Sequence, residues 1–308
     1  MDKPQYWQQF PGIDEKDTVT THPFIPSDGI PLSVHHFHEP AAESFIAMLP
    51  TSTPSLLMFR LAARLARDLP VICWEPRGST FMPNFPDWKT VTVHRHVQDL
   101  TEIASQRGIR TAHLVTWCSS TDIAAYAARN GTLNIASVTA IAPTLTYVDS
   151  NTSGFRKLFV PMLRSLPDAN EEEASRICRS IRTLASLRIA HNDDDALVQK
   201  LTYLNFSAPD RIRHYAGLIR AFHRTPSPEE RRLVLRDMFE KVPTFMMCFA
   251  DDEVVGTKVF SQLAGSRLQT ELQPKGTHFA PFRYPDLVYA SLSRFFGSIP
   301  LTRAKRIA

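Results

Sequence analysis

Residues 112–130 read Ala-His-Leu-Val-Thr-Trp-Cys-Ser-Ser-Thr-Asp-Ile-Ala-Ala-Tyr-Ala-Ala-Arg-Asn. The first part, 112–117, is a short and mostly apolar run that predicts a buried strand. The last part, 122–129, is rich in Ala and predicts a helix. Neither Pro nor Gly separates the two, so the chain has to turn from strand to helix within about three residues. The residue at that turn is Cys118.

Small residues stand on both sides of Cys118. Thr116 lies two residues before it and Ser120 two residues after it. This is the pattern of a nucleophile elbow, in which a sharp strand-to-helix turn presents a side chain at the top of a sheet. The usual form is G-x-S-x-G, whereas the sequence here is Thr-Trp-Cys-Ser-Ser. The chain therefore resembles the α/β-hydrolase family, with Cys in place of the nucleophilic Ser and without either Gly.

The order of the other elements agrees with that resemblance. Apolar runs bounded by turn signals predict strands over 18–25, 31–37, 44–49, 71–74, 112–117, 136–142, 243–250 and 268–272. Helical patterns cover 56–68, 93–107, 122–129, 256–264 and 285–296. Strands that alternate with helices predict an α/β fold, with a mostly parallel central sheet and helices on both faces. The resemblance covers about residues 17–297.

The alternation stops near residue 146. From 155 to 240 the patterns are only helical, and Pro161, Pro167, Pro209, Pro226 and Pro228 interrupt them. We therefore expect an α/β-hydrolase core over 1–146 and 241–308, with a helical cap inserted over 147–240. Residues 1–16 are polar and predict a loose lead-in.

The composition is that of a soluble globular protein, with 43% hydrophobic and 21% charged residues among 308. The 35 Lys and Arg against 31 Asp and Glu give a net charge of +4, too small to predict a nucleic-acid partner. The N-terminus carries no apolar signal segment, and no run of about 18 apolar residues predicts a membrane span.

Four cysteines stand at positions 73, 118, 178 and 248, and none forms a C-x-x-C pair. Cys73 and Cys248 lie in apolar runs, where a free Cys is usually a small buried hydrophobe. This usage predicts a cytoplasmic protein rather than a disulfide scaffold. Cys118 taken alone would fit a buried structural thiol better than a nucleophile, but the abrupt turn, its small neighbours and the chain order described next favour a nucleophile.

Two further residues complete a triad in the order that the family uses. Asp252 follows the strand expected at 243–250, and the resemblance implies that it orients the catalytic His. Its neighbour Asp251 is the alternative. His278 lies between the last strand and the last helix, in Lys-Gly-Thr-His-Phe, which resembles the Gly-x-His loop of the family. The resemblance implies that His278 is the general base and acid.

The resemblance also implies an oxyanion hole made of two backbone N–H groups. One is that of Ser119, the residue after the nucleophile. The other comes from the loop after the third strand, which in the family is rich in His and Gly. Here that loop is Leu-Pro-Thr-Ser-Thr-Pro at 49–54, so the donor is Ser52 or, alternatively, Thr51.

Several polar clusters have simpler explanations than a ligand site. His35, His36 and His38, and also His94 and His96, have spacings that can bind a metal, but an exposed edge strand and a helix start explain them better. We therefore predict no metal site. The acidic run 193–195 is expected to be an exposed loop. A series of Arg residues in the cap predicts a solvated helix face or a surface for an acidic partner, namely Arg211, Arg213, Arg220, Arg224, Arg231, Arg232 and Arg236.

A Cys at the elbow implies thioester chemistry. Enzymes of the family with Cys at this position are of three kinds: shuttles of acyl or aminoacyl groups between carrier proteins in nonribosomal peptide and polyketide pathways, polymer synthases that use hydroxyacyl-CoA, and lactone hydrolases. The polymer synthases keep Gly around their Cys, and the lactone hydrolases lack an extended cap. The resemblance thus favours an acyl- or aminoacyltransferase that forms a covalent Cys118 thioester. A thioesterase with the same triad is the alternative, and an inactive binding protein with this fold is the second alternative.

The implied partner is an acyl or peptidyl carrier protein, whose phosphopantetheine arm would deliver the substrate; no other cofactor is expected. Carrier proteins present an acidic recognition helix. Arg213, Arg220 and Arg224 recur at about whole helical turns and fall on one helix face, so we expect them to bind it.

Overall fold

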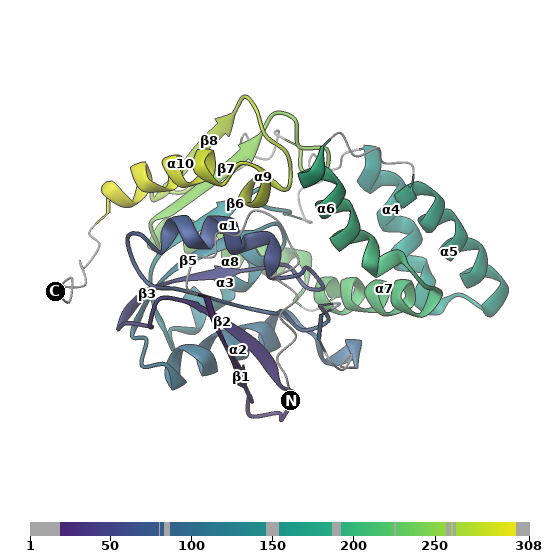
Figure 1. Cartoon of the computed structure of the whole chain (residues 1–308), viewed down its shortest axis with the longest axis horizontal. Coiled ribbons are helices and arrows are strands. Elements are labelled where there is room, and N and C mark those ends of the chain that lie inside the picture. The colour runs from purple at the N-terminus through teal and green to yellow at the C-terminus, as the bar shows by residue number, and fades with distance from the viewer. Residues whose placement is uncertain are drawn as a thin grey trace.

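A computed structural model describes residues 19–79, 81–82, 87–145, 154–186, 192–224, 226–256, 260 and 263–299. The strands of this part form one eight-stranded sheet in the order β1-β2-β4-β3-β5-β6-β7-β8 (Figure 1). The pairs β1–β2 and β2–β4 are antiparallel, and all other pairs are parallel. The strands are β1 Val19–Phe24, β2 Leu32–Phe37, β3 Glu43–Met48, β4 Val71–Trp74, β5 Thr111–Trp117, β6 Asn134–Ile141, β7 Thr244–Phe249 and β8 Leu268–Gln273.

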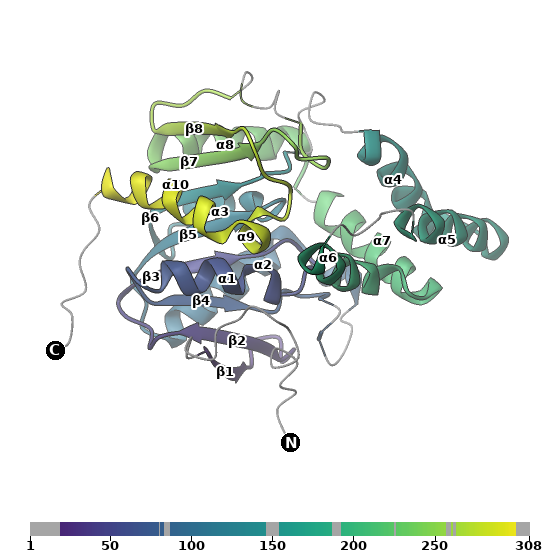
Figure 2. The same ribbon diagram turned by 45° about the horizontal axis from the view of Figure 1, so that its top comes forward.

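Helices cover both faces of the sheet, which explains why strands such as β4 and β7 are buried along their whole length (Figure 2). One face packs against α1 Leu56–Leu65, α9 Ala280–Arg283 and α10 Pro285–Gly297. The other face packs against α2 Val93–Gln106, α3 Ser120–Asn130 and α8 Pro228–Lys241. The predicted α/β class, mostly parallel sheet and two helical layers are confirmed.

Most predicted elements lie within one or two residues of the observed ones. Of the prolines expected to interrupt helices, Pro161 instead lies inside one. Pro209 and Pro228 do stand at breaks, as the first residues of their helices, where a missing N–H costs no hydrogen bond. Most of the helix expected at 256–264 lies outside the described residues, as does the lead-in at 1–16.

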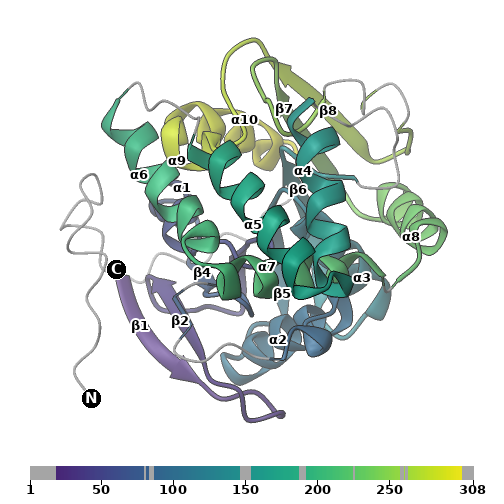
Figure 3. The same cartoon turned by 90° about the vertical axis from the view of Figure 1, so that its right-hand side faces the viewer.

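The inserted segment forms a separate helical layer beyond one end of the sheet (Figure 3). Its own small core joins apolar side chains of three helices, including Phe159, Ile181 and Ala216. The elements are α4 Gly154–Ser165, the 3-10 turn η4 Leu166–Asp168, α5 Glu171–Ser186, α6 Asp193–Tyr203, the 3-10 turn η5 Leu204–Phe206 and α7 Pro209–Arg224.

Helix α8, which the sequence assigned to the cap, packs instead on α3 of the core. Its apolar side chains, including Leu235 and Phe239, belong to the sheet's hydrophobic cluster. Arg231 of this helix is 1% exposed and forms an ion pair with the equally buried Asp122 of α3. The expectation of a solvated Arg231 is therefore wrong, because a buried carboxylate compensates its charge. We propose that the cap ends between α7 and α8 rather than at residue 240.

In the described part of the chain, no helix combines the length and the apolar character needed to cross a membrane.

Candidate active site

Cys118 lies at the turn between β5 and α3, in the left-handed backbone region with φ of 56°. For a residue other than Gly, this backbone conformation costs about 1–2 kcal/mol of free energy. Backbone bonds on both sides hold the turn: the Cys118 N–H donates to the Ile141 carbonyl (3.0 Å), and the Thr144 N–H donates to the Cys118 carbonyl (3.2 Å). The neighbouring strand β6 therefore fixes the position of the thiol, which is partly exposed.

The flanking small residues are buried, and their hydroxyl groups bond to backbone. The Thr116 hydroxyl donates to the Thr139 carbonyl (3.0 Å). The Ser120 hydroxyl accepts from the Trp117 N–H (2.9 Å) and donates to the Met48 carbonyl (3.1 Å). Ser and Thr thus replace the usual Gly residues without leaving buried polar atoms unsatisfied.

The structure brings His278 and Asp252 together. The Nδ1 atom of His278 lies 3.1 Å from Oδ2 of Asp252, whose side chain is fully buried. The other oxygen, Oδ1, accepts hydrogen bonds from the backbone N–H groups of Val254 (2.7 Å) and Val255 (2.8 Å). Asp251 is exposed and lines the cavity described below. Of the two neighbouring carboxylates, Asp252 is thus the one in contact with His278.

His278 also interacts with Cys118. Burial lowers the pKa of His278, but the negative charges of Cys118 and Asp252, together with hydrogen bonds to both, raise it to about 10. A second contact fixes the loop, because the Trp117 indole N–H donates to the His278 carbonyl (2.7 Å). An imidazolium on His278 would stabilise a thiolate on Cys118.

The two expected oxyanion donors lie in the same cavity as Cys118. Ser119 precedes the first residue of α3, where backbone N–H groups have no partner within the helix. Ser52 is buried and left-handed, with φ of 63°. The loop around Ser52 contains no Gly, and a backbone bond from the Thr53 N–H to the Pro50 carbonyl (3.2 Å) closes it.

Two side chains from other elements anchor that loop. His96 of α2 lies with Nε2 2.9 Å from the Thr51 hydroxyl, which donates to the Arg77 carbonyl (3.4 Å). Burial and the charges of Arg77 and Arg95 lower the pKa of His96 to about 3, so His96 is neutral and donates its Nε2 proton to Thr51. From the cap, the Asn205 amide donates to the Ser52 carbonyl (3.4 Å).

The cavity has a volume of about 510 Å³ and lies between the ends of the strands and the cap. Cys118 and His278 contribute to its floor. Aromatic residues of the cap line it in edge-to-face contact: the ring centroids of Phe159 and Phe206 lie 5.3 Å apart, and those of Phe206 and Tyr215 also 5.3 Å apart. Such a chamber suits a substrate with an apolar part held near the thiol.

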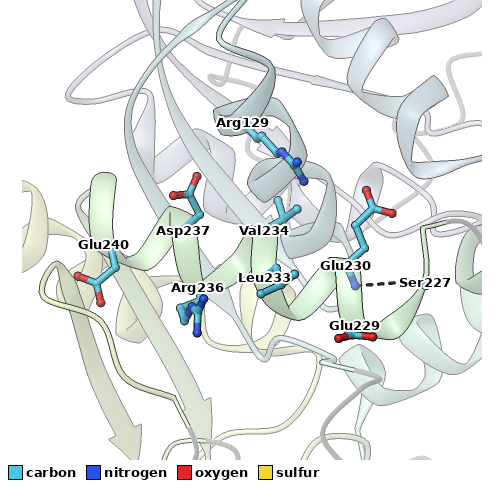
Figure 4. A pocket seen from close by; sticks show the side chains of 9 residues that line it. All are labelled: Arg129, Ser227, Glu229, Glu230, Leu233, Val234, Arg236, Asp237 and Glu240. Atoms are coloured by element: carbon cyan, nitrogen blue, oxygen red, sulfur yellow. Dashed lines mark hydrogen bonds between the residues drawn. The ribbon is translucent and has the colours of Figure 1, made fainter.

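A second cavity of about 620 Å³ lies along the outer side of α8 (Figure 4). Charged side chains such as Glu229, Arg236 and Asp237 surround Leu233 there. It contains none of the triad or oxyanion residues.

The arginines expected to bind a carrier protein have partners within the cap. Arg213 forms an ion pair with Glu171 (2.6 Å), and Arg220 with Asp168 (2.6 Å). Each of the two arginines therefore already has a carboxylate partner, although ion pairs at a surface are weak. The side chain of Arg224 lies outside the described residues. Their binding role stays a prediction.

The histidines of β2 differ from expectation. His35 and His36 are buried rather than exposed, because β1 covers β2 and makes β2 an inner strand. His35 bonds to the hydroxyl groups of Thr21 (3.0 Å) and Ser55 (3.1 Å), and burial lowers its pKa to about 3. Among the described residues, no group of three or more His, Cys, Asp or Glu side chains could hold a metal ion.

Three residues of the site escaped sequence reasoning, namely Thr144, His96 and Asn205. Thr144 follows β6, the strand next to the nucleophile strand, so its place at the shared edge of a parallel sheet was a usable signal. The spacing of His96 with His94 suggests a metal ligand or a helix start, and does not indicate a contact with Thr51. Asn205 lies far along the chain in the cap, and only the tertiary fold brings it to Ser52.

No protein-family model matches the chain, and no curated protein sequence matches it. Solved structures do resemble it. The haloalkane dehalogenase DatA from Agrobacterium tumefaciens C58 has a TM-score of 0.69 and 15% identity, over 92% of this chain and 98% of that one. An alpha/beta hydrolase fold protein from Burkholderia ambifaria gives 0.65 and 14%, over 88% and 96%. The epoxide hydrolase CorEH gives 0.66 and 13%, over 91% and 99%. The chain therefore has the α/β-hydrolase fold.

Proposed function

We propose that the protein is an acyl- or aminoacyltransferase that moves a thioester-bound acyl group through a covalent thioester on Cys118. The supporting observation is a Cys at a strained strand-to-helix turn, beside a His–Asp pair and at the floor of a capped cavity. A strained backbone at such a place suits a functional role, since a structural thiol would not need it.

The first half of the reaction loads the enzyme. The Cys118 thiolate attacks the carbonyl carbon of the donor thioester, and the negative charge moves to the carbonyl oxygen. The N–H groups of Ser119 and Ser52 would stabilise that oxygen. As the intermediate collapses, the bond to the donor sulfur breaks, and the His278 imidazolium gives its proton to the departing thiolate.

The second half reverses these steps with an acceptor thiol. Neutral His278 takes the acceptor's proton, and the acceptor sulfur attacks the acyl carbon. The Cys118–acyl bond then breaks, and Cys118 leaves as the thiolate beside the imidazolium. Asp252 keeps the His tautomer and stabilises the positive ring in both halves.

The chemistry of the nucleophile supports transfer. Each half-reaction exchanges one thioester for another of nearly equal free energy, so the overall reaction is close to thermoneutral in both directions. A Cys is already partly thiolate near neutral pH. A Ser at the same place would form the more stable oxygen ester and make return to a thiol unfavourable.

The cap supplies what a transferase needs beyond its triad. The aromatic wall of Phe159, Phe206 and Tyr215 would hold the apolar part of the acyl group and keep water from the acyl-enzyme. We propose an acyl or peptidyl carrier protein as the donor, with Arg213, Arg220 and Arg224 as its docking residues.

A thioesterase is the second candidate. The structural neighbours include proteins named as hydrolases, and water in place of the acceptor thiol would use the same residues. The two candidates share Cys118, His278 and Asp252 and differ only in what attacks the acyl-enzyme.

Intact-mass measurement after incubation with acyl-CoA or a loaded carrier protein tests the proposal. The wild type should gain one acyl mass, and Cys118→Ala should gain none. Addition of an acceptor thiol should release the mass as a new thioester if the protein is a transferase, and as free acid if it is a thioesterase. Absence of any adduct, together with tight binding of the donor, would support a binding protein instead.

A further inference from the structure

Thr144 contacts the reacting sulfur. Its Oγ1 atom lies 3.0 Å from Sγ of Cys118, and its side chain is buried, with 4% of the residue exposed. The same residue donates its N–H to the Cys118 carbonyl (3.2 Å). Thr144 is therefore fixed against Cys118 by both its backbone and its side chain.

The segment that carries Thr144 is itself anchored. It follows β6 directly, and the Ala142 N–H donates to the Met247 carbonyl of β7 (2.8 Å). Ala142 has φ of 44°, in the left-handed region where Ala is disfavoured. Two residues after this turn, Thr144 lies against Cys118.

The direction of the hydrogen bond follows from charge. A hydroxyl group can donate or accept, but a thiolate can only accept. The proposed attack uses the Cys118 thiolate, and in that form of Cys118 the Thr144 hydroxyl has to donate. Hydrogen bonds to an ionised acceptor are roughly twice as strong as neutral ones.

We propose that Thr144 is a further catalytic residue, whose hydroxyl stabilises the Cys118 thiolate by a hydrogen bond before attack and again when Cys118 leaves. The proposal rests on Cys118 as the nucleophile of the proposed function. No proton is transferred to or from Thr144. In the acyl-enzyme the sulfur is neutral and accepts weakly, so the bond contributes to the thiolate states and little to the thioester state between them.

The hydrogen bond from Thr144 to the thiolate would affect the rate of acyl transfer. A thiol that has to leave as well as attack benefits from a low pKa, because leaving rates rise as the pKa of the leaving thiol falls. The nucleophilicity lost in exchange is smaller, with a Brønsted slope of about 0.4–0.5. Thr144 would thereby favour the return of Cys118 from the acyl-enzyme.

The test is the pH dependence of Cys118 alkylation by iodoacetamide, followed by intact mass, with Cys118→Ala as background for the other thiols. In Thr144→Val the midpoint should rise by about one pH unit or more, since a bond to a charged group is lost. The rate on the high-pH plateau should stay equal or increase. Thr144→Ser keeps the hydroxyl and should follow the wild type.

A merely structural role would give a different result. If Thr144→Val lowers the rate at every pH and leaves the midpoint unchanged, the proposal is wrong. Thr144→Ala removes the same hydroxyl with less bulk at the site and should show the same shift, and the ultraviolet absorbance of the thiolate gives the midpoint without the reagent. If either variant is poorly folded by circular dichroism, the other decides the question.

The experiment uses no acyl donor, so it separates the two proposals. An unshifted midpoint with a normal acyl adduct overturns the role of Thr144 alone. A shifted midpoint without any acyl adduct supports Thr144 and overturns the transferase.

Discussion

The turn at Cys118 and the loop at Ser52 each contain a left-handed residue other than Gly, and different hydrogen bonds hold the two conformations. Cys118 and Ser52 are both left-handed residues at positions where the resemblance leads one to expect a Gly nearby. Backbone groups of the neighbouring strand hold the turn at Cys118. At Ser52 a backbone bond within the loop, from Thr53 to Pro50, is joined by side-chain bonds from His96 of α2 and Asn205 of the cap.

The difference teaches which parts of the site depend on the cap. The thiol is placed by the sheet, at the end of the almost wholly buried strand β5. The loop of the second oxyanion donor depends on a helix layer and on a contact with the inserted segment. We therefore expect thiolate formation to be insensitive to changes in the cap and oxyanion stabilisation to be sensitive to them.

The largest loss of activity should follow a change in the His278–Asp252 pair, which lies at the edge of the sheet. Asp252→Asn should lower kcat by on the order of 10²–10⁴, because the His278 tautomer and the imidazolium lose their support. Asp251→Asn is the matched control and should change kcat little, because its side chain is exposed. Paired kinetic assays with a thioester donor measure both, and the reverse ranking would transfer the role to Asp251.

A smaller loss is expected where the cap reaches the oxyanion loop. Asn205→Ala removes the amide that bonds to the Ser52 carbonyl, and kcat should fall by about tenfold, less than the 10²–10³ of a lost oxyanion donor. Alkylation of Cys118 should be unchanged. Asn170→Ala, which removes an exposed Asn bonded to the Glu173 N–H of its own helix, is the control. A parallel loss of alkylation in Asn205→Ala would contradict the distinction between the two regions.

The charge state of His278 tests its electrostatic interaction with Cys118 and Asp252. Its pKa of about 10 is raised by Cys118 and Asp252. The folded state therefore holds this proton more tightly than the unfolded chain, whose His pKa is about 6.5. The stabilisation is complete below about pH 6.5 and is lost as the pH rises through 10. In Cys118→Ser the pKa should fall, as an NMR titration of the ring would show; an unchanged pKa would mean that the thiolate does not contribute.

The smallest effect concerns the surface of the cap. Charge reversal of Arg220 and Arg224 should raise KM for a carrier-bound donor several-fold and leave KM for a small soluble thioester unchanged, because rim charges mainly govern association. Asp168→Asn is the matched control, since it breaks the ion pair with Arg220 but keeps the positive charge. Equal losses with both donors would make these arginines structural.

The local part of the site could be predicted from the sequence. The run from 112 to 130 predicts a strand, a sharp turn and a helix, and the structure has β5 and α3 there with Cys118 between them. The resemblance to α/β-hydrolases predicts Asp252 and His278, and both follow strands, whose carboxyl ends share one edge of a parallel sheet.

Long-range contacts decided the rest. The burial of His35 and of Arg231 depends on β1 and on Asp122, which no local pattern around these residues reveals. Long-range contacts also decide the packing of α8 on the core and the bonds that His96 and Asn205 make to the loop around Ser52.

The sequence by itself thus determined the alternating elements and the turn at Cys118, because backbone propensity and hydrophobic periodicity act over a few neighbouring residues. The roles expected of Cys118, Asp252 and His278 come from the resemblance to the α/β-hydrolase family and not from these local patterns. Only the tertiary structure decided that Thr144 contacts the sulfur, that His96 and Asn205 hold the oxyanion loop, and that aromatic cap residues line the cavity. These contacts join residues far apart in the chain, and their geometry follows from packing rather than from local preference.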